Sequence, residues 1–322
     1  MAIPKANYGD IKYLTPDNLY EQIKAFTSGM SVTKGTYELD VPKCTLEDFE
    51  WNHMDQMHRP SIHNTYDKGI RIAVGPNFAV SLTQWGKWPI FITVSDVYIA
   101  KGLFYQSLTL AGIVFLHSII SMEEIGNDTI RLKDEWYIAS HKLLKWLHKP
   151  LNNKLYKLNA RLQQEDEQLR QGRFALRKKG YTFQTDCPDY YNSNRLTNNT
   201  IYPILTNGNI LSTDWITNEP VIRKVGDIEF IFQKDNDGTI LIWPAVCPHE
   251  GGPLLQGKFC KNHQISCPWH GLRFSAVKLS QTSPLGTKYG FNYLLDGNNI
   301  HIEQIERVKS NTDVAEEMSI LT

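Results

Sequence analysis

The sequence lacks the features that would direct it to a membrane or to nucleic acid. Lys and Arg total 34, as do Asp and Glu, so no global basic field attracts nucleic acid or anionic lipid. The opening Met-Ala-Ile-Pro-Lys-Ala shows no charged segment followed by an apolar one, so no secretory leader is evident. The most apolar stretch, 103–120, is interrupted by Gln106, Thr109 and His117 and is too polar for a membrane span. We expect a cytoplasmic protein without a membrane span or a nucleic-acid partner.

Cysteine is scarce, with five residues in 322. Disulfides are rare in a reducing cytosol, so cysteines that cluster are candidates for metal ligands. The chain also lacks a Gly-x-Gly-x-x-Gly run, which excludes that signature of a built-in flavin or nicotinamide domain. Its length is enough for two domains.

Two strand-rich regions flank a helix. Six short runs rich in β-branched and aromatic residues lie between Ile70 and Ile138 and predict an antiparallel meander. Leucines from Leu144 to Leu169 recur at helical spacing, and Pro150 is a possible kink. A run rich in Asn, Thr and Ser at 190–200 indicates a linker, after which short β-like runs return. The sequence predicts an α+β chain with domains at 1–190 and 200–310.

The second region holds paired cysteines and histidines. Cys247-Pro-His249 is followed, after seventeen residues, by Cys267-Pro-Trp-His270. In a Rieske centre two cysteines hold one iron of a [2Fe–2S] cluster and two histidines hold the other. A structural zinc site uses the same ligand types, but zinc fingers usually group the cysteines and then the histidines. The mixed pairs favour the cluster.

From 201 to about 306 the chain resembles the Rieske domain of the Rieske non-haem iron oxygenases. The resemblance rests on Cys-Pro-His-Glu-Gly-Gly-Pro-Leu at 247–254 and Cys-Pro-Trp-His-Gly at 267–271. The segment Asn52-x2-Asp55-x2-His58-x4-His63 matches the catalytic-iron motif of the same family. A non-haem Fe(II) that activates O₂ needs two imidazoles and one carboxylate on one face.

The iron motif also raises a question of local geometry. Asp55 and His58 are three residues apart and would share a helical face. An unbroken helix would not align His63 with them, but Pro60 would disturb the helix and let His63 turn inward. The alternative is a helix with ordinary surface or buried histidines.

The third iron ligand should be acidic. Glu165 and Asp166 both flank the apolar face of the leucine helix, and spacing alone does not choose between them. In the resembling family this ligand is typically an Asp on a late helix of the catalytic domain. The resemblance therefore implies Asp166, with Glu165 as the alternative.

The resemblance also implies an architecture and a reaction. The N-terminal domain would be a START-like helix-grip fold, and the all-β Rieske domain would follow it, in the reverse of the family's usual order. A separate reductase or ferredoxin would supply electrons, and the iron would use O₂ to hydroxylate or dealkylate an apolar or aromatic molecule. The rival hypothesis is an electron carrier fused to a START-like ligand-binding domain without a second iron.

The family also implies a link between the two metal sites. In that family an Asp bridges an iron His to a cluster His, often between the subunits of a trimer. The matching residues here are Asp55, His58 and His270. A homotrimer is therefore expected, and whether His270 comes from the same chain stays open.

Overall fold

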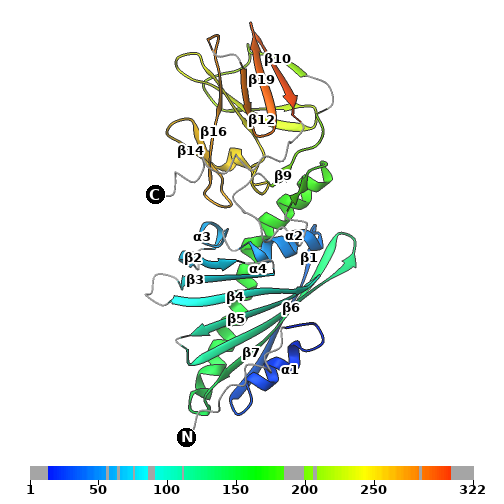
Figure 1. The fold of residues 1–322 in the computed structure, drawn as a ribbon, viewed down its shortest axis with the longest axis vertical. Coiled ribbons are helices and arrows are strands. Elements are labelled where there is room, and N and C mark those ends of the chain that lie inside the picture. The colour runs from blue at the N-terminus through cyan, green and yellow to red at the C-terminus, as the bar shows by residue number, and fades with distance from the viewer. Residues whose placement is uncertain are drawn as a thin grey trace. The chain divides into compact units, whose positions relative to one another are not determined.

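A computed structural model describes residues 14–55, 58–63, 66–74, 77–85, 91–110, 112–184, 199–205, 209–282 and 285–305 (Figure 1). The chain divides into two compact units, one formed by Met1–Pro42 and Asp67–Gln163 and the other by Lys43–Tyr66 and Gln164–Thr322. Most of the expected linker at 190–200 lies outside the described residues, and the domain division near it stays a prediction. None of the described helices is long and apolar enough to cross a membrane.

The first unit is built on a seven-stranded antiparallel sheet with the order β1-β7-β6-β5-β4-β3-β2. Its strands are β1 (Ser31–Pro42), β2 (Tyr66–Val74), β3 (Phe78–Trp85), β4 (Phe91–Ala100), β5 (Leu103–Leu110), β6 (Val114–Gly126) and β7 (Thr129–Ser140). The predicted meander is confirmed as β2 to β7. The sequence did not indicate β1, which pairs with β7 from Ser31 to Pro42, because about half of its side chains are polar and most are at least partly exposed.

Helices cover the two faces of this sheet. On one face, α1 (Leu19–Phe26) packs Leu19 and Ile23 against Ile119. On the other, α4 (His148–Lys178) approaches the sheet through Asn152, which accepts a hydrogen bond from Trp136 at 2.8 Å. The long helix and the helix-grip architecture are therefore confirmed.

Pro150 falls in the first turn of α4. A proline is tolerated there, because the N–H groups of a first helical turn have no partner within the helix. A short 3₁₀ helix, η3 (Lys142–Leu147), precedes α4.

A buried carboxyl joins α4 to the sheet. Asp134 on β7 accepts hydrogen bonds from Ser118 at 2.5 Å and from Asn159 of α4 at 2.7 Å. Burial raises the pKa of Asp134 to about 6, although both hydrogen bonds oppose the rise. The folded protein therefore holds a proton on Asp134 at pH values where the unfolded chain has released it.

Asp134→Asn should stabilise the protein at pH 8 by about 1–3 kcal/mol, because the wild-type carboxyl must ionise in a buried place. The folded state binds more protons between the ordinary pKa of 3.8 and about 6, so wild-type stability falls as the pH rises through this range. The variant should lose that dependence. Urea unfolding at pH 4 and pH 8 measures this dependence, with Glu124→Gln at an exposed position near the end of β6 as control. A variant less stable than wild type at pH 8 would contradict the assignment.

The second unit combines short helices with β-sheets. It contains α2 (Leu46–Met54), α3 (Arg59–Ile62) and the part of α4 from Gln164 to Lys178. Its sheets have the orders β10-β20-β19-β18, β11-β12-β13-β17 and β14-β15-β16, and β8 pairs with β9. The strands are β8 (Thr182–Phe183), β9 (Thr200–Ile201), β10 (Asn209–Ser212), β11 (Val221–Val225), β12 (Ile228–Lys234), β13 (Ile240–Pro244), β14 (Lys258–Cys260), β15 (Gln264–Ser266), β16 (Arg273–Ser275), β17 (Val277–Leu279), β18 (Leu285–Lys288), β19 (Phe291–Asp296) and β20 (Asn299–Gln304).

One hydrophobic core runs through this unit. It joins Trp51 of α2 and Leu169 of α4 to residues such as Phe230, Trp243 and Trp269 of the β-rich part. The predicted β-rich C-terminal domain is confirmed.

Candidate iron–sulfur and metal sites

Two loops of similar build carry the paired cysteines and histidines. The first follows β13, and the second connects β15 to β16. The N–H of Gly251 donates to the carbonyl of Cys247 at 3.0 Å, and the N–H of Gly271 donates to that of Cys267 at 2.9 Å. Both glycines have positive φ, 89° and 70°, a conformation that other residues rarely adopt. The glycines after each motif therefore let both loops close tightly.

The four predicted cluster ligands come together at these loops. Cys247 and Cys267 are buried, and the rings of His249 and His270 have centroids 4.7 Å apart. A hydrogen bond with Cys247 lowers the pKa of Cys267 to about 5 and favours its thiolate, whereas burial and the same hydrogen bond raise the pKa of Cys247. Nδ1 of His270 is buried without a hydrogen-bond partner among the described residues. Buried thiols beside an imidazole nitrogen that lacks a partner fit a [2Fe–2S] cluster.

Gly252→Ala should prevent stable cluster assembly, because its Cβ would lie 2.6 Å from Sγ of Cys267. A cysteine that ligates iron must keep its sulfur in place, so Sγ of Cys267 cannot move aside to make room for the added methyl group. Visible absorption and acid-labile sulfide measure the loss. Gly238→Ala is the control, since its Cβ would meet open space, while its φ of 88° adds a backbone strain that Gly252 does not have. A full complement of sulfide in Gly252→Ala would refute this reading.

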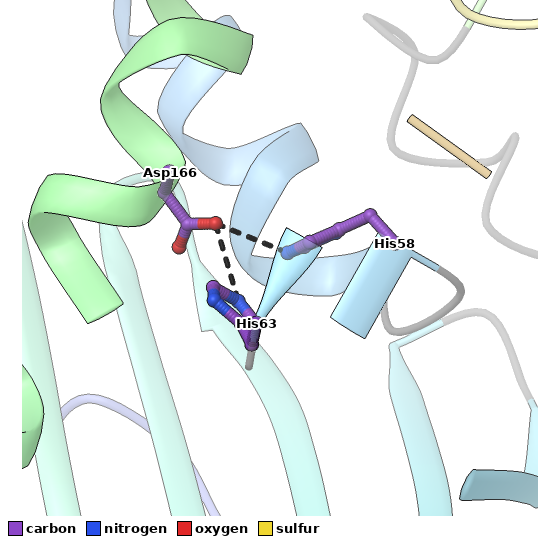
Figure 2. A group of neighbouring side chains, drawn as sticks. All are labelled: His58, His63 and Asp166. Carbon is purple, nitrogen blue, oxygen red and sulfur yellow. Dashed lines mark ion pairs between the residues drawn. The ribbon is translucent and has the colours of Figure 1, made fainter. Parts of the chain in front are cut away.

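Three buried side chains from two distant parts of the sequence form a second cluster. His58 and His63 flank α3, and Asp166 projects toward both from α4 (Figure 2). Oδ1 of Asp166 lies 3.2 Å from Nε2 of His58 and 3.2 Å from Nε2 of His63. One possible ligand atom from each residue lies within 4.8 Å of the others. The arrangement suits one small cation.

The chemistry of this cluster also fits a metal. Both ring nitrogens of His58 and Oδ1 of Asp166 are buried. None of these three atoms has a hydrogen-bond partner within the described structure. Burial opposes ionisation of Asp166, but His58 and His63 lower the pKa of this carboxyl to about 2. A carboxylate beside two imidazoles is the donor set of a mononuclear non-haem iron.

Glu165, the alternative third ligand, contacts a different nitrogen of His63 from the one that Asp166 faces. Its Oε2 lies 3.0 Å from Nδ1 of His63, on the side of the ring opposite to the nitrogen that faces Asp166. Groups that bind the outer nitrogen of a ligating histidine fix the orientation of its ring. The geometry therefore favours Asp166 as the ligand and Glu165 as the group that orients His63.

The local structure of the motif differs from the sequence-based expectation. Asp55 and His58 do not share one helix, because α2 ends at Met54 and Asp55 is its C-cap residue. His58 is the N-cap of α3, and Pro60 stands in the first turn of that helix. The proline begins a new helix, since its fixed φ suits a first turn, instead of kinking an existing one.

Asp55 lies between His270 of the candidate iron–sulfur site and His58 of the second candidate metal site. Its Oδ2 accepts a hydrogen bond from Nε2 of His270 at 2.5 Å and lies 3.5 Å from Nδ1 of His58. Burial favours the neutral acid, but the charge and hydrogen bond of His270 hold the pKa of Asp55 well below its usual range. Burial likewise disfavours the charged imidazole, and Asp55 outweighs it by raising the pKa of His270 to about 10. One carboxylate thus connects the two candidate sites within one chain.

Sequence reasoning missed a buried network of charges in the same unit. Arg173 of α4 is fully buried and donates to Asp48 of α2 and to Glu250, each at 3.1 Å. Glu250 directly follows the cluster candidate His249. The guanidinium of Arg173 also lies 4.1 Å from the centroid of the Trp51 ring. The network ties both helices to the first cluster loop. Its sequence signal was available, since Arg170, Arg173 and Arg177 share one helix face.

Comparison with known proteins identifies the C-terminal part. Residues 209–285 match the Rieske [2Fe-2S] domain. This match includes all four predicted ligands, Cys247, His249, Cys267 and His270, and it favours the cluster over zinc. The chain therefore contains a Rieske [2Fe–2S] domain, which follows a helix-grip domain.

One curated relative points to an oxidoreductase. The chain is 29% identical, over 101 residues, to cholesterol 7-desaturase nvd 1 of Ciona intestinalis. The alignment covers 30% of this chain and 21% of the relative, so the chain matches about a fifth of that protein's length.

Solved structures similar to the chain cover about half of it. Truncated norcoclaurine synthase from Thalictrum flavum is 14% identical with a TM-score of 0.36, covering 49% of this chain and 97% of that one. The Zhui aromatase/cyclase from Streptomyces sp. R1128 is 12% identical with a TM-score of 0.36, covering 46% and 96%.

Proposed function

We propose that this protein is the oxygenase component of a Rieske-type system. The observation that carries the proposal is the buried group of His58, His63 and Asp166, connected through Asp55 to His270. When bound, the cluster supplies single electrons and a mononuclear Fe(II) supplies O₂ activation. Cys247, His249, Cys267 and His270 would hold the cluster, and the two histidines that flank α3 would hold the iron together with Asp166 of α4.

The surrounding residues prepare both sites. Glu165 orients the ring of His63, and Asp55 keeps Nε2 of His270 occupied, so that its Nδ1 is directed to the cluster. Arg173 neutralises Asp48 and Glu250 in a place that water does not reach. All of these contacts are made within one chain.

The remaining parts of the proposal concern substrate and partners. The substrate is an apolar or aromatic small molecule, which suits the largely apolar interior of a helix-grip fold. The reaction is hydroxylation or dealkylation with O₂. A separate reductase or ferredoxin delivers the electrons, and the protein works as a cytoplasmic homotrimer.

Metal analysis tests the proposal. Purified protein should contain about three irons and about two acid-labile sulfides per chain, since a Rieske cluster accounts for two of each. His58→Ala, His63→Ala and Asp166→Ala should each lose one iron and keep the cluster spectrum. Glu165→Gln is the matched control and should keep all of its iron, because the amide oxygen can still accept from His63.

The same measurement decides on the rival function. About two irons in the wild-type protein, unchanged in the three variants, would identify an electron carrier fused to a ligand-binding domain. Iron lost from Glu165→Gln but not from Asp166→Ala would move the third ligand to Glu165.

A further inference from the structure

One end of the N-terminal sheet presents exposed apolar side chains. In η3, Leu143 is 78% exposed and Trp146 is 70% exposed. Phe26, Val32 and Ile113 are each more than 40% exposed. These five residues are called the end surface below.

The strand register brings the end surface together. Ser140, the last residue of β7, pairs with Ser31 of β1 and with Val114 of β6. Val32 and Ile113 are therefore next to the paired positions, and η3 begins two residues after Ser140. Phe26 joins them through its ring, whose centroid lies 5.5 Å from that of Phe115 on β6. Figure 1 shows α1 and the start of α4 at the same end of the sheet.

The segment that carries Leu143 and Trp146 is strongly basic. Residues 141–164 contain five lysines and one arginine but no Asp or Glu: Lys142, Lys145, Lys149, Lys154, Lys157 and Arg161. Lys142, Lys145 and Lys149 are exposed. The chain as a whole carries no net charge, so the overall composition does not reveal this local excess of positive charge.

We propose that the end surface and its lysines bind the surface of an anionic lipid bilayer. Trp and Leu enter the boundary between headgroups and acyl chains, while lysines around them pair with anionic headgroups. Two of the most exposed large apolar residues of the chain, Leu143 and Trp146, alternate with Lys142 and Lys145 in a single short helix. A soluble acidic protein would satisfy the lysines but offers less reason for such far-exposed apolar side chains. The proposal does not depend on the oxygenase assignment.

Vesicle co-sedimentation of the full chain tests this. Binding to vesicles of 70% phosphatidylcholine and 30% phosphatidylserine should exceed binding to pure phosphatidylcholine by roughly tenfold or more, and 0.5 M salt should weaken it. Leu143→Ala/Trp146→Ala and Lys142→Glu/Lys145→Glu should each lower binding by roughly tenfold or more.

Matched controls lie in the Rieske part of the chain. Ile204→Ala/Ile210→Ala removes two side chains that are 80% and 59% exposed, and Lys234→Glu/Lys278→Glu reverses two exposed lysines. Both control proteins should bind as wild type does. Equal binding to the two vesicle types, equal losses in the controls, or binding to an acidic soluble protein but to no vesicle would each overturn the proposal.

Discussion

Asp55→Asn should leave both metals bound and the cluster reducible, yet slow reoxidation of the reduced cluster by O₂ and substrate by roughly 100-fold or more. Asp55 is the residue between His270 and His58, and its carboxylate accepts from His270 at 2.5 Å. An amide of the same size cannot replace the negative charge that binds His270. Stopped-flow absorption of the dithionite-reduced protein measures the rate.

The control for this experiment is an exposed aspartate of the same unit. Asp227→Asn changes the charge equally, and its side chain is 72% exposed in a surface ion pair with Lys224. Its reoxidation should match that of the wild-type protein. Near-normal reoxidation in Asp55→Asn would exclude the bridge, whereas loss of iron from that variant would assign Asp55 to binding of the metal.

Mixing chains that lack one site each should not restore turnover. A His58→Ala chain would lack the mononuclear iron, and a Cys247→Ser chain would lack the cluster. Asp55 meets His270, and Arg173 meets Glu250, within one compact unit of one chain. We therefore expect the electron to pass within a chain, so that a mixed assembly contains no complete path.

Turnover of the mixture, measured after dissociation and reassembly, tests this expectation. It should stay at the background of the separate variants, while wild type mixed with either variant keeps activity in proportion to its share. Substantial turnover in the mixture would show that electrons cross between chains. An inactive wild-type protein with a normal cluster would instead refute the oxygenase assignment itself.

Local patterns carried much of the prediction. The Cys-x-His and Cys-x-x-His pairs predict the cluster because each short motif combines one cysteine with one histidine, which favours a Rieske centre over zinc. The six strands from β2 to β7 and the helix α4 were predictable from residue types and periodicity, because the spacing of apolar residues indicates which face of an element is buried. By contrast, β1 escaped notice because an edge strand with polar side chains carries little periodic signal.

The neighbourhood of the iron motif depended on long-range contacts. Spacing could not choose between Glu165 and Asp166, because adjacent residues on a helix differ by about 100° and both flanked the apolar face. Only the approach of α4 to α3 shows which nitrogen of His63 each carboxylate meets. The partners of Arg173 could not be identified from spacing either, since they are 125 and 77 residues away.

The sequence by itself therefore predicted the four cluster ligands and determined the order of the two folds. It also supplied the two histidines of the second site, because these features lie within short stretches of chain. The tertiary structure alone decided that Asp166 meets those histidines, that Asp55 reaches His270 in the same chain, and that basic η3 stands beside exposed apolar residues. Each of these depends on where α4 and the strand ends pack. Packing is set by the burial of side chains over the whole unit, which no local spacing records.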